Sequence, residues 1–137
     1  AEYSDDGFSL YGMAGFSGIK YNYENHFAME EGTDNTLTAE SDFITGGQVK
    51  GGANYNLSET FNVFANAGYV SKVPIFDNVI SDRDGTKAED PENEKFLSFE
   101  LGTQYLSLSQ TINLKANAYF TQWQDRSNNV GVVNQDG

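Results

Sequence analysis

The stretch GANYNLSETFNVFANAGYVSKV, residues 52–73, decides the fold of this chain. Apolar residues occupy every second position on both sides of a short polar segment, Ser58–Thr60. Such strict alternation is the pattern of a β-strand whose two faces meet different surroundings. A short polar segment between two alternating runs is typical of a tight hairpin turn. The sequence therefore predicts two antiparallel strands, at about residues 44–57 and 61–71.

The same design recurs later in the chain, where Ser107–Gln110 separates two further alternating runs, at about residues 96–106 and 110–124. Another alternating run covers residues 7–24, and its apolar phase shifts near Gly18, which predicts a bulge or twist there. We therefore expect an all-β fold, an antiparallel meander of about five long strands.

Composition narrows the class of protein. The chain has 137 residues, a net charge of -12, no cysteine, 14% aromatic residues and a mean hydropathy of -0.54. The negative charge argues against a nucleic-acid partner, because no basic stripe is present to neutralise phosphates. No apolar run is long enough for a transmembrane helix. A chain that is polar overall yet rich in aromatic residues suits a transmembrane β-barrel, in which half of each strand faces lipid and half faces water.

The expected connections alternate in length. The turns near Ser58 and Ser109 are short, whereas the loops at about 25–43 and 73–95 are long and acidic. Short turns at one end and long loops at the other are typical of outer-membrane barrels. Five strands are too few to close such a barrel, and an open edge in lipid is not viable. We therefore expect residues 1–137 to be one segment of a larger barrel.

Five sequence motifs carry a family resemblance. They are NVFANAGY at Asn62–Tyr69, SKVP at Ser71–Pro74, NEK at Asn93–Lys95, SFELG at Ser98–Gly102 and YFTQWQDR at Tyr119–Arg126. In this order and spacing, the region from about residue 44 to 126 resembles the barrel of TonB-dependent outer-membrane receptors, in particular those of Bacteroidetes. The plug domain, the energy-coupling box and the terminal aromatic strand of that family have no counterpart in these residues.

The resemblance implies a function in nutrient import across the Gram-negative outer membrane. The cargo is left open among an iron chelate, cobalamin, a glycan and a peptide. The implied partners are outer-membrane lipid, the remaining barrel segments and plug of the same receptor, the inner-membrane TonB complex reached through the full-length protein, and a surface lipoprotein. The alternative is a protein of a different class, a soluble or surface-exposed β-sandwich that binds a glycan or a partner protein; its strands would also be half polar.

Aromatic residues supply the candidate sites. Rings near strand ends are expected to form interfacial girdles in a membrane; these are Tyr21, Tyr23, Tyr55, Tyr69, Tyr105 and Tyr119. Phe64 and Trp123 interrupt the polar phase of their strands, and with Phe76 they are the candidates for contact with a ligand ring.

The sequence contains no motif that supports a catalytic or metal site, and we predict neither an enzyme nor a cofactor. The acidic loop at Asp82–Gly85 lacks the ligand spacing of an EF-hand. The single histidine, His26, does not make a zinc site by itself. Glu30, Glu31 and Asp34 are interpreted as solvated loop residues. Glu100 lies in the polar phase of its strand, where we expect it to face a wet lumen and to pair with Lys115 or Arg126.

Overall fold

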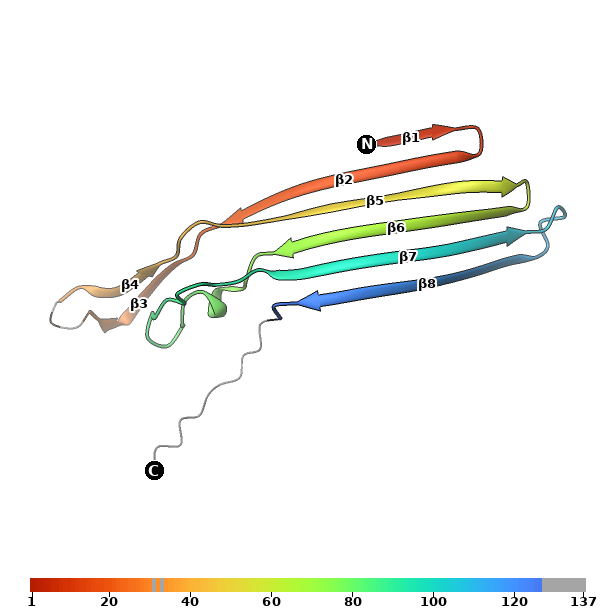
Figure 1. Ribbon diagram of the computed structural model, residues 1–137. Coiled ribbons are helices and arrows are strands. Elements are labelled where there is room, and N and C mark those ends of the chain that lie inside the picture. The colour runs from red at the N-terminus through yellow and green to blue at the C-terminus, as the bar shows by residue number, and fades with distance from the viewer. Residues whose placement is uncertain (31, 33, 127–137) are drawn as a thin grey trace, which may run out of the picture.

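The computed structural model describes residues 1–30, 32 and 34–126. Its elements are β1 (Glu2–Asp5), β2 (Phe8–Ile19), β3 (Asn22–Met29), β4 (Thr36–Glu40), β5 (Ile44–Ser58), β6 (Phe61–Lys72), the 3-10 helix η1 (Phe76–Asn78), β7 (Glu94–Leu106) and β8 (Asn113–Gln124). Six strands form one sheet in the order β1-β2-β5-β6-β7-β8, and β3 and β4 form a separate hairpin. All neighbouring strands are antiparallel (Figure 1). The predicted antiparallel meander is confirmed, and the described strands form an open sheet.

The strand expected at residues 7–24 is two strands, so that prediction is wrong in its extent. β2 ends at Ile19, and the chain leaves the sheet before β3 begins at Asn22. Tyr21 instead pairs with Ser41: the Ser41 N–H donates to the Tyr21 carbonyl at 2.8 Å, and the Ser41 hydroxyl accepts from the Tyr21 N–H at 2.8 Å. The shift of apolar phase near Gly18 therefore marks the approach to a strand end.

Three further boundaries differ from expectation. β1 was not expected; it pairs with the start of β2 through a turn in which Gly7 has a φ of 81°, a conformation that favours glycine. Residues 25–43, expected as a loop, contain the end of β3 and all of β4, with residues 31 and 33 outside the described part. The last strand begins at Asn113, not at residue 110, because Ser107 and Ile112 close a longer turn by mutual hydrogen bonds.

The register divides the sheet into two faces. Residues directly opposite one another on neighbouring strands project to the same side. What we call the apolar face carries cross-strand rows of apolar and small side chains, such as Leu10, Ala53, Ala65, Leu101 and Ala118. What we call the polar face carries the intervening rows, such as Tyr11, Gly52, Asn66, Glu100 and Tyr119. The period-2 alternation of the sequence thus becomes a sheet with two chemically different sides.

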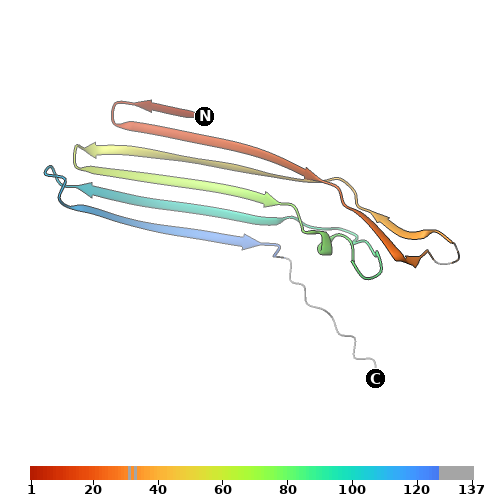
Figure 2. The same ribbon diagram turned by 180° about the vertical axis from the view of Figure 1, so that it is seen from behind.

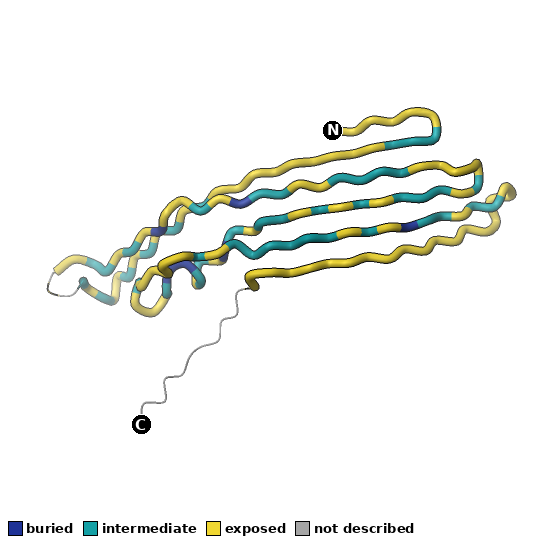
Figure 3. The backbone as a smooth tube through the Cα atoms, viewed as in Figure 1, coloured by how far each residue is buried: buried dark blue, intermediate teal, exposed yellow. Residues whose placement is uncertain are grey.

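Neither face of this sheet is covered by other parts of the described chain. The buried aliphatic side chains of the described residues are Val79 and Ile80, and both lie in the loop after β6 (Figure 3). On the apolar face, Leu101 is 64% exposed and Val49 is 62% exposed. The hairpin β3–β4 extends beyond one end of the sheet and forms no second layer (Figures 1 and 2). None of the described helical residues forms a helix that could cross a membrane.

Candidate functional site

A ladder of hydrogen bonds crosses the middle of the polar face. The Tyr11 hydroxyl on β2 donates to Asn66 Oδ1 on β6 at 3.0 Å. Asn66 Nδ2 donates to Glu100 Oε2 on β7 at 2.9 Å, and Asn117 Nδ2 on β8 donates to Glu100 Oε1 at 2.7 Å. Each oxygen of the Glu100 carboxylate thus accepts one amide N–H and keeps a further lone pair. The ladder fixes the orientation of a carboxylate at the centre of the sheet.

The expected partners of Glu100 are wrong, although its position on the polar face agrees with expectation. Glu100 is opposite Tyr119, whereas Lys115 is opposite Gln104, four residues away along β7. The Arg126 guanidinium lies over the Trp123 ring instead, with its Cζ 4.5 Å from the ring centroid. The register therefore supplies Glu100 with neutral amide donors.

A depression of about 400 Å³ lies beside the ladder on the polar face. Its lining includes Tyr11, Lys50, Gly68, Ser98, Glu100 and Tyr119. The Lys50 stem crosses Gly68, because a Cβ built on Gly68 would lie 3.3 Å from Lys50 Cγ. Because Gly68 has no side chain, the Lys50 side chain can extend across β6 toward β7. Tyr119, which is 80% exposed, supplies an open ring at the other side.

The three candidate ligand-contacting aromatics all have partners within the chain. Phe64 lies across Gly102, where an added Cβ would overlap its ring. Trp123 stacks on Phe96 with centroids 5.0 Å apart. Both Phe64 and Trp123 project from the polar face, as their registers with Gly102 and Phe96 require.

Phe76, on η1, belongs to what we call the loop module, the described residues of 20–43 together with 73–93. Its ring meets Tyr21 edge-on at 5.5 Å and Tyr23 at 6.2 Å. The Tyr21 hydroxyl donates to the Pro74 carbonyl, and the Tyr23 hydroxyl donates to the Asp82 carbonyl, each at 3.0 Å. These contacts attach the long loop to the β3–β4 hairpin.

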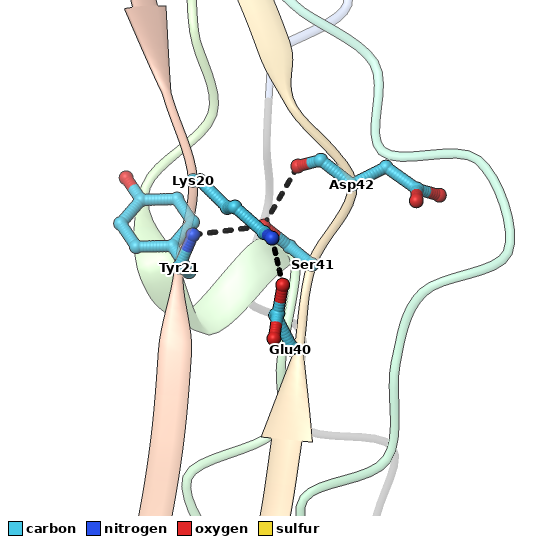
Figure 4. A network of polar contacts seen from close by, with 5 residues as sticks. All are labelled: Lys20, Tyr21, Glu40, Ser41 and Asp42. Carbon is cyan, nitrogen blue, oxygen red and sulfur yellow. Dashed lines mark hydrogen bonds and ion pairs between the residues drawn. The ribbon is translucent and has the colours of Figure 1, made fainter.

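Ser41 is the polar centre of the loop module (Figure 4). It is 5% exposed, and its hydroxyl donates to the Asp42 carbonyl at 2.9 Å while it accepts from Tyr21. Lys20 and Glu40 form an ion pair beside it. Asn93 connects the loop module to the sheet. Its Nδ2 donates to the Thr45 carbonyl on β5 at 2.7 Å and to the Ser71 hydroxyl on β6 at 2.8 Å.

The six tyrosines expected at membrane interfaces fall into three groups. Tyr55, Tyr69 and Tyr105 lie on the apolar face, with Tyr55 and Tyr105 toward the short turns and Tyr69 toward the loop module. Tyr21 and Tyr23 are half-buried in the loop module. Tyr119 lies mid-strand on the polar face, so its position does not support an interfacial role.

The acidic loops contain no metal cluster of three histidine, aspartate or glutamate side chains within the described residues; Glu31 lies outside them. His26 Nδ1 lies 3.7 Å from the Glu24 carboxylate. The pKa of Asp84 is lowered from its ordinary value because its carboxylate accepts hydrogen bonds from the Ser81 side chain and from Thr86. Asp84 thus shapes the turn at Gly85, whose φ is 69°.

Comparison with known protein families, curated proteins and solved structures finds no match to this chain. The arrangement of the polar face therefore carries the functional argument. The sequence pattern alone does not distinguish Tyr11, Lys50, Asn66 or Asn117 from the other residues of the polar phases. Alternation places all four in the polar phases of their strands. Only the strand register shows that Tyr11 and Asn66 lie in the cross-strand row of Glu100 and that Asn117 lies close enough to bond to it.

Proposed function

We propose that this chain forms part of the wall of a large transmembrane β-barrel of the TonB-dependent receptor type. In this account the complete receptor lies in a Gram-negative outer membrane and imports a nutrient with energy from the TonB system. The observation that carries the proposal is a single-layered sheet with an exposed apolar face, an exposed polar face and almost no buried core among the described residues. A water-soluble domain would bury the apolar face against a second layer.

The size of the apolar face supports the proposal. Its apolar rows run along β6 from Phe61 to Tyr69, a span of eight residue steps. At about 3.3 Å per residue this is roughly 26 Å along the strand, or roughly 20 Å along the membrane normal at a strand tilt of about 40°, which is most of the apolar band of roughly 25 Å on outer-membrane barrels. The row that follows contains Ser71 and Lys95, which suit the polar boundary of a membrane.

The edges and ends of the sheet support it as well. β8 has no described partner on its outer side, and the N-terminal residues cover β2 only as far as Gly12. In the proposal, strands of the remaining barrel complete these edges, since unpaired backbone groups are costly in lipid. The tight turns lie at one end and the loop module at the other (Figure 1), as in outer-membrane barrels. The loop module would face a surface lipoprotein or cargo, and the polar face would line the lumen beside the plug.

The test is folding of the complete protein that contains this chain into lipid vesicles, because the open edges of the chain by itself are costly in lipid. The proposal predicts that vesicles carry the protein to the top of a density gradient, that alkaline carbonate does not extract it and that circular dichroism retains its β-sheet signal. A water-soluble monomer with a cooperative unfolding transition would contradict the wall and favour the sandwich alternative.

A further inference from the structure

We infer that the depression beside Glu100 binds a zwitterionic group, an ammonium and a carboxylate on one small molecule, such as a short peptide. Its lining places one cation and one anion around a common space, with tyrosine rings at its sides. The inference rests on the proposed function only in that the polar face must remain open to water.

Glu100 supplies the site for the ammonium. Its carboxylate is already oriented by Asn66 and Asn117, so little ordering is needed when a ligand arrives. The ladder uses neutral donors, which leaves the negative charge of Glu100 without an ion-pair partner among the described residues. A ligand ammonium gains a charge-assisted hydrogen bond there. The exposed Tyr119 ring in the same row adds a cation–π surface.

Lys50 supplies the site for the carboxylate. Its stem lies over Gly68, and its row is next to that of Glu100 on the polar face. No ion pair joins Lys50 to Glu100, although both line the depression. A purely cationic ligand would be repelled by Lys50, and a purely anionic one by Glu100. Only a ligand that carries both charges satisfies the two groups together.

The test uses the complete protein that contains this chain, folded in detergent micelles, and four probes of similar size. Glycylglycine carries both charges, N-acetyl-glycylglycine only the carboxylate, glycylglycinamide only the ammonium, and maltose neither. NMR titration follows the amide signals of Gly68, Ser98 and Tyr119. We expect glycylglycine to shift these signals with a dissociation constant at least tenfold lower than that of each other probe.

Charge-removing variants sharpen the test. Glu100→Gln and Lys50→Met should each weaken glycylglycine binding at least fivefold. Two control variants remove the same charges at other places. Glu59→Gln lies in the turn between β5 and β6, and Lys115→Met lies on β8, four residues from Tyr119, the residue opposite Glu100. Both should leave glycylglycine binding unchanged.

Equal shifts with all four probes, tightest binding of maltose, or binding unaffected by Glu100→Gln and Lys50→Met would overturn the inference. If the protein inserts into vesicles yet binds none of the probes, the proposed zwitterion site is refuted and the proposed barrel wall still stands. A protein that binds glycylglycine but stays water-soluble refutes the wall and leaves the site.

Discussion

At the scale of single residues, glycines of the sheet lie beneath side chains from neighbouring strands. Gly102 is buried although β7 is uncovered on both faces, because the Phe64 ring of β6 lies across it. An aromatic ring over a strand glycine covers backbone that would otherwise be exposed. This contact accounts for Phe64 on the polar face, where the sequence pattern alone indicates a ligand-contacting ring.

We predict that Phe64→Ala destabilises the sheet by about 1–2 kcal/mol, less than the roughly 3–5 kcal/mol of a fully buried phenylalanine, because Phe64 is only half-buried. Urea unfolding of the chain in micelles measures the change. Tyr119→Ala, which removes a ring that is 80% exposed on the same face, is the matched control and should change stability by less than about 0.5 kcal/mol. Equal losses in the two variants would contradict this role of Phe64.

Asp84 makes the turn at Gly85 dependent on pH. Its pKa lies below the ordinary value of 3.8, because hydrogen bonds from Ser81 and Thr86 favour the carboxylate. The stabilisation is therefore fully present above pH 3.8 and is lost as pH falls through the lowered folded-state pKa. We predict that the Thr86 amide proton, 3.1 Å from Asp84 Oδ1 in donor–acceptor distance, shifts upfield in NMR over that acidic range only. Asp84→Asn should abolish this change of chemical shift with pH. A midpoint of the change above pH 3.8 would be inconsistent with hydrogen bonds that lower the pKa of Asp84.

At the scale of elements, the loop module has its own small core, separate from the sheet. Val79 and Ile80 are buried there, and the ring of Phe76 contacts Tyr21 and Tyr23. The sheet meets the module at other residues: Asn93 donates hydrogen bonds to Thr45 and Ser71, the Phe43 ring lies over Gly18, and Val73 lies beside Gly46. Loosening the module should therefore leave the sheet folded.

We predict that Ile80→Ala costs the loop module about 2–5 kcal/mol, the usual range when a buried leucine or isoleucine is shortened to alanine, and speeds tryptic cleavage after Arg83 and Lys87. Circular dichroism should retain the β-sheet signal. Ile75→Ala, at a residue that is 49% exposed in the same loop, is the control and should leave cleavage nearly unchanged. Loss of the sheet signal in Ile80→Ala would show that the module and sheet unfold as one unit.

Much of the element order was predictable from local pattern. Alternation and short polar turns identified the hairpin of β5 and β6 and the one of β7 and β8. The break at Lys20 is indicated in the sequence by the shift of apolar phase near Gly18, but that shift alone does not distinguish a bulge from the end of a strand. Just after β2 ends, Tyr21 pairs with Ser41, a contact 20 residues away in the chain that the local pattern does not indicate. The ladder at Glu100 needed long-range information for the same reason, since its partners lie 34 and 17 residues away.

At the scale of the whole molecule, the proposal assigns lipid to the apolar face and water to the polar face. Ala53 and Asn54 are consecutive in β5 and project to opposite faces, so they form a matched pair. We predict that Ala53→Arg destabilises the vesicle-folded complete protein by roughly 2–4 kcal/mol, as for arginine on the lipid face of a barrel near the bilayer midplane. Asn54→Arg should cost far less. Urea titration in vesicles measures both, and equal effects would remove the distinction between the faces.

The most direct test is a scan of spin labels along β6 of the complete protein in lipid vesicles. The chain has no cysteine, so single cysteines introduced from Phe61 to Val70 each report one position. The account predicts a period of two residues: labels at odd positions collide mainly with oxygen dissolved in lipid, and labels at even positions collide mainly with a water-soluble nickel complex. Equal access of the nickel complex at all ten positions would contradict a wall between lipid and water.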